Sequence, residues 1–235
     1  MNQFDWIAHT GCDGTPYNSL VSCQAGYETG ADVLEVDVRT SRDGIAVLYH
    51  DDQPDVSQYT YEEWTAAGYE PVEKLETILT PYRGKPVAFN LDLKTEEAYT
   101  AAAAVVDRLD VWSQVYFTGV TDHLANGPRA RHVIWNLPPI PTDLADDIYE
   151  ERIRQYCQQA EQAGYAGINA QYGSCRPALV AQAHQLGLRV WLYTLPADEP
   201  LLRHYADMGV DALSVTDLTP AMELMKRGST DGHRS

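Results

Sequence analysis

The sequence has few basic residues for its length. It contains 17 lysines and arginines against 34 aspartates and glutamates in 235 residues, which leaves a formal net charge of −17 at pH 7. A surface this negative repels polyanions such as nucleic-acid backbones and anionic lipid surfaces. We therefore expect no nucleic-acid partner, and a small anionic ligand only where a cation offsets the local charge.

Long apolar runs and paired cysteines are also missing. No stretch reaches the roughly 18 apolar residues that a transmembrane helix needs. The first eleven residues, MNQFDWIAHTG, show no basic segment followed by an apolar one, so they do not have the pattern of a secretory signal. No C-x-x-C pair occurs among the four cysteines, which are Cys12, Cys23, Cys157 and Cys175. We therefore expect a cytoplasmic protein with reduced thiols and no integral membrane association.

Short β-prone segments alternate with amphipathic or alanine-rich segments along the whole chain. This alternation predicts an α/β protein with parallel strands, because a parallel crossover needs a helix. The expected strands are Trp6–His9, Val33–Val38, Ala46–His50, Val87–Leu93, Val115–Thr118, His132–Leu137, Ala166–Ala170, Arg189–Thr194 and Ala212–Val215. The clearest expected helices are Glu96–Leu109, Asp143–Ala163, Pro177–Leu186, Glu199–Met208 and Pro220–Lys226.

Eight strand–helix units remain when Ala46–His50 is counted as a hairpin extension of the second strand. Eight units in this length are typical of a (β/α)8 TIM barrel. The main alternative is an open doubly wound sheet, but no G-x-G-x-x-G turn follows the first strand. We expect one barrel domain over residues 1–227 and a flexible tail over residues 228–235. Nothing in the sequence specifies an oligomeric state.

Carboxylates gather at the ends of two predicted strands. Glu35 and Asp37 lie two residues apart on one strand, so their side chains point to the same face, and Asp92 lies on the next strand of the barrel. Three close carboxylates repel one another unless a cation joins them, and oxygen ligands suit Mg²⁺, Ca²⁺ or Mn²⁺. The alternative is that these acids form structural ion pairs with Arg39 and Lys94.

Two histidines, His9 and His50, also lie at strand ends. Imidazole titrates near neutral pH, so one histidine can take a proton from a nucleophile while the other gives a proton to a leaving group. The alternative for each is that it caps a strand or fills a polar pocket. We interpret the other five histidines as structural.

The order of these motifs resembles that of glycerophosphodiester phosphodiesterases, which read H-R-G, P-E-N-T, E-x-D-V, D-G-x-x-V-x-H-D and N-x-E-x-K. The corresponding segments of this chain are His9–Gly11, Pro16–Ser19, Glu35–Val38, Asp43–Asp51 and Asn90–Lys94. The segments Val190–Thr194 and Gly209–Ala212 are similar to the family's last two strands. The resemblance thus spans nearly the whole chain.

This resemblance implies a TIM barrel of the PLC-like phosphodiesterase type that cleaves a small soluble phosphodiester in lipid metabolism. It implies one bound divalent metal ion, Mg²⁺ or Ca²⁺, with Glu35, Asp37 and Asp92 as the ligands. It makes His9 and His50 the acid–base pair, and a substrate hydroxyl beside the phosphate would lead through a cyclic phosphate.

Three further residues are implied to bind substrate, and the chain departs from the family at one of them. Lys94 would contact a phosphate oxygen, and Tyr193 would line the substrate cleft. Thr10 takes the place of the family's arginine, which is a bidentate phosphate anchor. Asp92 also replaces the usual glutamate. Only about forty residues separate His50 from Asn90, so the family's insertion is expected to be missing.

A second resemblance is to sphingomyelinase D-type phospholipases, which act on lipid phosphodiesters. They too lack an arginine after the first histidine and contain D-L-K-T, found here at Asp92–Thr95. They are secreted and disulfide-bonded, however, and they use an apolar membrane-facing loop. Tyr59, Tyr61 and Trp64 lie in a suitable segment, but two glutamates among them would be repelled by an anionic membrane. A third interpretation is a barrel that binds a phosphate-bearing ligand without turning it over.

Overall fold

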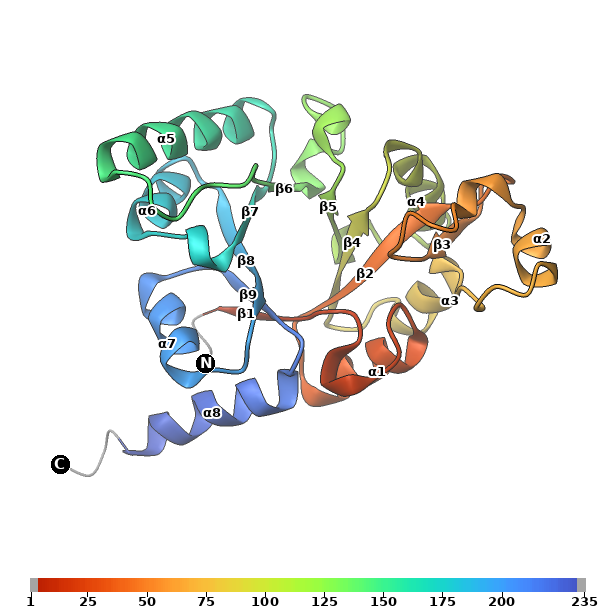
Figure 1. The fold of residues 1–235 in the computed structure, drawn as a ribbon, viewed down its shortest axis with the longest axis horizontal. Helices are drawn as coiled ribbons and strands as arrows, with labels where there is room; N and C mark the ends of the chain where they lie inside the picture. The colour runs from red at the N-terminus through yellow and green to blue at the C-terminus, as the bar shows by residue number, and fades with distance from the viewer. Residues whose placement is uncertain (1–3, 232–235) are drawn as a thin grey trace.

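Eight parallel strands form the wall of a barrel in the computed structural model, which describes residues 4–231 (Figure 1). Around the barrel the strands follow the order β5-β4-β2-β1-β9-β8-β7-β6. The two end strands meet through one parallel bridge, Phe117 with Val133. The predicted TIM barrel is therefore confirmed. Its strands are β1 (Asp5–Ala8), β2 (Val33–Thr40), β4 (Ala88–Leu93), β5 (Val115–Gly119), β6 (Ile134–Asn136), β7 (Gly167–Gln171), β8 (Arg189–Leu195) and β9 (Ala212–Val215).

The ninth strand, β3 (Ala46–Leu48), is the hairpin extension that the sequence indicated. It pairs antiparallel with the end of β2, with Val38 opposite Leu48 and Thr40 opposite Ala46. β3 therefore lies at the carboxyl end of β2, and His50 is the second residue after it. All nine predicted strands are present, each within two residues of its expected ends.

The sequence predicted eight complete strand–helix units, but one of them lacks its helix. Helices surround the barrel everywhere except between β5 and β6. Only two 3-10 turns, Asp122–Leu124 and Ala130–His132, make this connection. Asn126 has a φ of 59° and Pro128 has no amide hydrogen, so an α-helix does not form there. The helices are α1 (Leu20–Thr29), α2 (Tyr61–Ala66), α3 (Leu75–Leu79), α4 (Glu96–Leu109), α5 (Asp146–Gln162), α6 (Pro177–Gln185), α7 (Glu199–Met208) and α8 (Leu218–Asp231).

The last helix extends further than the sequence indicated. α8 continues to Asp231, so residues 228–231, which were expected to begin a flexible tail, belong to this helix. Residues 232–235 lie outside the described residues. Within residues 4–231, no helix is long and apolar enough to cross a bilayer.

The interior of the barrel is filled by an apolar floor. Inward-facing side chains from five strands form one buried cluster: Ile7, Val33, Ile134, Trp191 and Ala212. The outward-facing side chains of the strands belong to a larger core beneath the helices. Because the floor closes the barrel, polar side chains at the carboxyl ends of the strands have a dry apolar base.

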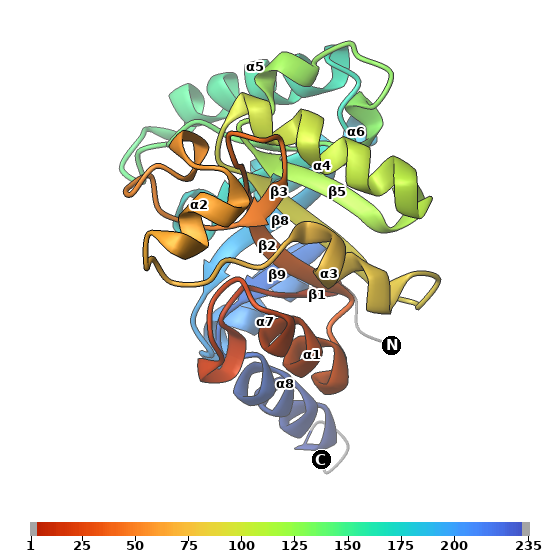
Figure 2. The same cartoon turned by 90° about the vertical axis from the view of Figure 1, so that its right-hand side faces the viewer.

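A separate small core lies under the excursion between β3 and α3, which stands out beside the barrel in Figure 2. Trp64 of α2 is only 1% exposed, and the rings of Tyr49, Tyr59 and Tyr69 pack around it. The Trp64 indole nitrogen also donates to the Glu70 carbonyl at 2.8 Å. The aromatic residues considered for a membrane-facing loop therefore pack against this small core, so they do not form the apolar loop that would have favoured the lipid-acting alternative.

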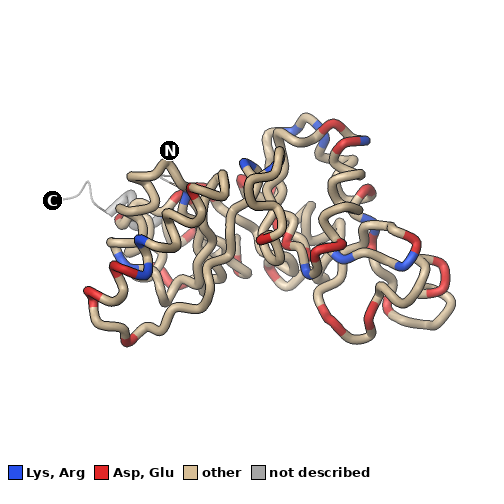
Figure 3. The backbone as a smooth tube through the Cα atoms, turned by 90° about the horizontal axis from the view of Figure 1, so that it is seen from above, with Lys and Arg blue, Asp and Glu red and all other residues tan. Residues whose placement is uncertain are grey.

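The negative charge of the chain is spread rather than gathered. Figure 3 shows acidic positions along the backbone on both sides of the molecule, with basic positions between them. Exposed pairs such as Arg42 with Glu63 and Arg108 with Glu76 join the two signs locally. The acids at the barrel mouth differ from these exposed pairs because they are buried. Burial of a charge costs free energy unless the charge is paired.

Candidate active site

A polar cavity of about 200 Å³ opens at the carboxyl ends of the barrel strands. This is the end at which TIM barrels carry their chemistry. The cavity brings together seven of the eight residues that the sequence singled out. It is lined by Ile7, His9, Glu35, Asp37, His50, Asn90, Asp92, Lys94, Thr118, Asn136, Asn169, Tyr193, Thr194 and Ser214.

Three carboxylates converge on one wall of this cavity. Asp37 on β2 is directly opposite Asp92 on β4 in the strand pairing, and Glu35 lies two residues before Asp37 on the same face. One oxygen from each carboxylate lies within 4.8 Å of the other two. Asp37 is 2% exposed and Glu35 is 7% exposed. The register of two neighbouring strands is therefore what assembles the cluster.

Gly119 allows β5 to pass close to this cluster. It has a φ of +78°, and a Cβ atom there would lie 2.7 Å from Asp92 Oδ1 and 2.3 Å from the Leu93 carbonyl oxygen. Both distances are too short for carbon and oxygen, so a side chain at this position would displace Asp92 or its strand. The preceding residue, Thr118, places its hydroxyl 2.8 Å from Asp92 Oδ1.

Lys94 is the one cation that lines the cavity among the described residues. Its Nζ lies 2.7 Å from Asp37 Oδ1 and 2.5 Å from Asp92 Oδ2. Burial alone would lower the pKa of Lys94, but the two carboxylates outweigh burial and raise it. Three carboxylates and one ammonium leave a formal charge of −2, which a divalent cation would neutralise. The donor set, made only of carboxylate oxygens, therefore fits a hard divalent metal ion.

Glu35 is the carboxylate that burial affects most. Burial raises its pKa to about 7, and Asp37 and Asp92 add to this rise, whereas His9 opposes it. The Thr10 amide also donates to Glu35 Oε2 at 2.8 Å, which favours the ionised form. A cation between the three acids would offset their repulsion and keep Glu35 ionised near neutral pH.

Thr10 differs from its expected role as a substrate contact. Its side chain is 1% exposed and does not line the cavity. The Thr10 hydroxyl instead accepts a hydrogen bond from the Asn18 amide at 2.5 Å. In this structure Thr10 therefore holds Glu35 and Asn18 in place, and it does not face the cavity.

Both candidate acid–base histidines line the cavity, and in each ring the Nδ1 atom lies within hydrogen-bond distance of an oxygen. His9 Nδ1 lies 2.9 Å from the Thr10 carbonyl oxygen, and His50 Nδ1 lies 2.9 Å from Asp51 Oδ1. An oxygen acceptor at Nδ1 places the proton there, so Nε2 of each neutral ring is left as a proton acceptor. The side chain of His9 is 28% exposed and that of His50 is 65% exposed.

Tyr193 lies across the barrel from the acids. It projects from β8, and in the strand order β8 is on the far side of the barrel from β4. Burial raises the pKa of the Tyr193 hydroxyl, and the Asp92 carboxylate raises it further. The tyrosine is therefore close enough to the cluster to form the opposite wall of the cavity.

Comparison with known proteins finds one matching family model. Residues 9–118 match the family model described as the glycerophosphoryl diester phosphodiesterase family. The chain therefore resembles this family over just under half of its length. The enzymes of that family are phosphoric diester hydrolases, so the match agrees with the predicted enzyme class.

Relatives of this glycerophosphodiesterase-like barrel are distant. An uncharacterized protein of Bacillus subtilis, YqiK, is 31% identical over a stretch that spans 37% of this chain and 44% of that protein, less than half of each. A glycerophosphodiester phosphodiesterase structure from Parabacteroides distasonis has a TM-score of 0.75 at 19% identity and covers 99% of each chain. One from Thermotoga maritima has a TM-score of 0.76 at 16% identity, covering 94% of this chain and 98% of that one.

A third structure holds a ligand. It is an Oleispira antarctica phosphodiesterase in complex with the product sn-glycerol-3-phosphate, with a TM-score of 0.72 and 21% identity. It covers 94% of this chain and 96% of that one. At these identities the three structures show the shared barrel fold.

The glycerophosphodiesterase-like site contains residues to which the sequence assigned no role. Asn18 is the clearest, because its amide nitrogen donates to Asp37 Oδ2 at 2.8 Å and its carbonyl oxygen accepts from the Asp37 amide at 2.9 Å. Its position in a P-E-N-T-like turn was the available signal. Asn136 and Asn169 line the far wall, where the Asn169 side-chain amide donates a hydrogen bond to Asn136 Oδ1 at 2.8 Å. Their positions at strand ends were the only sequence signal for a place in the site.

We expect the variant Asn18→Gly to weaken divalent-metal binding about 10- to 100-fold, since it removes the side chain that orients Asp37. Glycine is the right replacement because Asn18 has a φ of 52°, which alanine would strain. Titration with Mg²⁺ or Ca²⁺ by isothermal calorimetry measures the effect. Asn126→Gly is the matched control, as Asn126 has a φ of 59° and does not line the cavity. Equal affinities of the two variants would show that Asn18 does not position Asp37.

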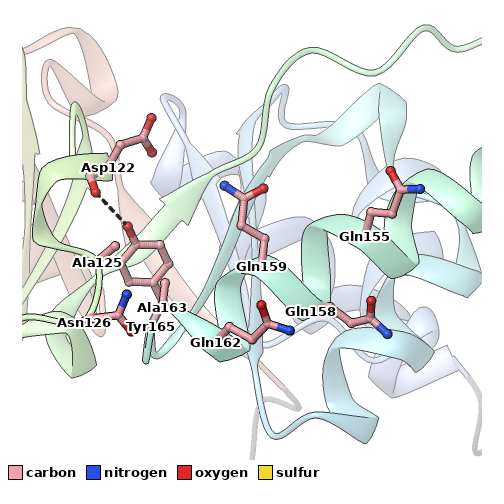
Figure 4. A pocket seen from close by; sticks show the side chains of 9 residues that line it. All are labelled: Asp122, Ala125, Asn126, Gln155, Gln158, Gln159, Gln162, Ala163 and Tyr165. Carbon is pink, nitrogen blue, oxygen red and sulfur yellow. Dashed lines mark hydrogen bonds between the residues drawn. The ribbon is translucent and has the colours of Figure 1, made fainter.

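A larger cavity, of about 530 Å³, lies on the outer side of the barrel, where the helix between β5 and β6 is missing (Figure 4). Gln155, Gln158, Gln159 and Gln162 of α5 form one side, and Tyr165 donates to the Asp122 carbonyl opposite. Asp122 is its one carboxylate, and that group accepts from the Trp135 indole nitrogen at 2.6 Å. With no histidine, lysine or group of acids, this cavity lacks the means for acid–base or metal chemistry.

Proposed function

We propose that this chain is a metal-dependent phosphodiesterase that cleaves a small glycerophosphodiester-like molecule at the mouth of the barrel. The observation that supports this most is the joint lining of one cavity by three carboxylates, Lys94 and two histidines. Each group has a use in phosphodiester cleavage, and the family match agrees with that reaction class. The product named for the Oleispira antarctica structure suggests a glycerophosphate half for the substrate.

Glu35, Asp37 and Asp92 would hold one divalent ion, Mg²⁺ or Ca²⁺. When bound, the ion would stabilise negative charge on the phosphate and orient the phosphate beside the histidines. Lys94 already holds Asp37 and Asp92 by ion pairs, and it faces the same cavity. In our proposal its ammonium also contacts a phosphate oxygen, which is the role that the sequence suggested.

His9 and His50 would act as the general base and general acid. Because Nδ1 of each ring is held by an oxygen, Nε2 is the atom that exchanges protons with the substrate. One histidine takes the proton of the attacking oxygen, which comes from water or from a substrate hydroxyl. A new P–O bond forms, the P–O bond to the leaving alcohol breaks, and the other histidine protonates that alcohol. Attack by a substrate hydroxyl gives a cyclic phosphate, and attack by water gives a monoester.

We also propose a cytoplasmic location. All four cysteines are free and buried in the structure, and burial raises the pKa of each thiol. Buried thiols that form no disulfide are typical of proteins in a reducing compartment.

A panel of small phosphodiesters tests the proposed function. The purified protein is incubated with glycerophosphodiesters in the presence of Mg²⁺ or Ca²⁺, and phosphorus NMR follows the products. We expect a monoester or a cyclic phosphate signal that disappears when EDTA is added. Turnover that survives EDTA would contradict metal dependence, whereas no turnover of any phosphodiester would favour a barrel that only binds a phosphate-bearing ligand.

A further inference from the structure

A histidine forms a hydrogen bond across the line where β5 meets β6. Within residues 4–231 these two strands meet through the bridge of Phe117 with Val133, whereas the other neighbouring strands of the barrel pair in ladders. We call this line the seam. His132 directly precedes Val133, and its Nδ1 lies 3.1 Å from the carbonyl oxygen of Val115, the first residue of β5. The imidazole therefore joins the seam at the amino ends of the strands, away from the candidate active site.

The His132 ring also packs among groups from both sides of the seam. Its centroid lies 5.0 Å from that of Trp112, which precedes β5, and the guanidinium carbon of Arg129 lies 3.9 Å from the centroid of the same indole. Asp107 of α4 accepts a hydrogen bond from Trp112 Nε1 at 2.5 Å, and its Oδ1 lies 3.6 Å from an Arg129 nitrogen. These contacts connect the segment before β5 with the segment before β6 around the imidazole.

The second ring nitrogen of His132 has no such contact. Nε2 is buried and has no hydrogen-bond partner among the residues that the structure describes. Because the Val115 carbonyl can only accept, the neutral ring carries its proton on Nδ1, and Nε2 keeps a lone pair. Protonation of Nε2 would place a charged N–H group in this buried position without an acceptor, which costs free energy. The surroundings of the ring therefore suit its neutral form.

The charged groups around His132 favour the neutral form as well. Burial lowers the pKa of His132, and the guanidinium groups of Arg131 and Arg129 on its own segment lower it further, whereas the hydrogen bond to the Val115 carbonyl opposes them. Asp107, on the α4 side of the seam, is held by Arg129. A proton on Nε2 would thus meet two cations nearby and no carboxylate partner among the described residues.

We propose that His132 is a proton-operated latch on the barrel wall, which holds the seam closed while its ring is neutral and releases the seam when the ring is protonated. Opening of the seam exposes Nε2 to water, so the open form binds the proton more tightly than the closed form. The closed form keeps its full advantage above about pH 6.5, where a hydrated imidazole is neutral, and loses that advantage as the pH falls further. The latch residues do not line the candidate active site, so the latch acts on the wall itself.

Backbone amide hydrogen exchange at pH 7.5 and pH 5.5 tests the latch. Each rate is divided by the intrinsic rate at that pH to give a protection factor, and β1 serves as the internal reference. In the wild type we expect the protection of β5 and β6, relative to β1, to fall about three- to tenfold at the lower pH, within what one proton allows.

Two variants separate the bond across the seam from its response to acid. The side-chain amide of His132→Asn can still donate to the Val115 carbonyl but does not titrate, so this variant should keep its protection at pH 7.5 and show no fall at pH 5.5. His132→Phe keeps a ring but loses the bond, so its protection should be low at both pH values. His123→Asn is the matched control, because His123 is exposed and lies in the same connection between β5 and β6, and it should show the wild-type fall.

NMR of the ring nitrogens adds a measurement that needs no variant. At pH 7.5 we expect the His132 proton on Nδ1. A proton on Nε2 instead, equal wild-type protection at the two pH values, or a fall that persists in His132→Asn would each overturn the latch. The wild-type measurements decide the question even where a variant does not fold.

Discussion

His9→Ala and His50→Ala should each lower turnover of the best phosphodiester substrate at least about 100-fold. Each variant removes the ring nitrogen that exchanges a proton in the proposed mechanism, and no other titratable ring lines the first cavity except that of Tyr193. The decrease should appear in kcat, measured at saturating substrate and metal. His204→Ala is a matched control, because His204 is exposed and lies outside both cavities.

The pH profile separates an acid–base role from a structural one. A wild-type profile with two limbs should lose one limb in each variant, since one of the two proton transfers no longer has its donor or acceptor. Thermal melting should stay close to that of the wild type for His50→Ala, because this side chain is 65% exposed. If either variant retains near-full turnover, the histidine pair is not the acid–base pair.

Asp37→Asn should abolish measurable Mg²⁺ or Ca²⁺ binding, or weaken it at least about 100-fold, and turnover should fall in parallel. Asn18 and Lys94 both contact the Asp37 carboxylate, and Asp37 is the most buried of the three acids. Its amide replacement has the same shape but no charge. The cluster then has two carboxylates against Lys94, and its attraction for a divalent ion is reduced.

The measurement is the rise in melting temperature that the metal causes. The wild type should gain stability with added metal, because a ligand that binds only the folded state shifts the unfolding equilibrium. Asp37→Asn should gain little, while Asp207→Asn, an exposed aspartate far along the chain, should behave as the wild type. A full metal-induced shift in Asp37→Asn would instead support the interpretation of these acids as structural ion pairs.

Much of the barrel could be predicted because its strands are short, apolar and regularly spaced. α4 and α7 were predicted with the ends that the structure has, since an alanine-rich run and a final Gly209 define them. α1 was not among the clearest predicted helices because small and polar residues interrupt its apolar face, although Ser19 caps its first turn and Gly30 its last. α2 and α3 are too short for a helical period to emerge.

The site was predicted in part for a similar reason. Spacing along one strand placed Glu35 beside Asp37, and the pairing of β2 with β4 brought in Asp92, as a parallel barrel requires. The role of Asn18 depends on a turn with positive φ, and that of Asn169 on which strands face each other across the barrel. Neither relation is contained in local sequence spacing. Thr10 was assigned to substrate by position alone, whereas burial decides its partners.

Only a single bridge joins the β5 and β6 edges of the barrel wall, and the strands on its two sides contribute different residues to the site. β1 to β5 carry the acids, Lys94 and both histidines, while β6 to β9 contribute neutral polar groups and Tyr193. Because the ladder between β1 and β9 holds the halves together on the other side, amide hydrogen exchange should be fastest along this seam and slowest in β1. Transient opening there would widen the mouth of the barrel to admit or release a ligand without moving the acids relative to the histidines.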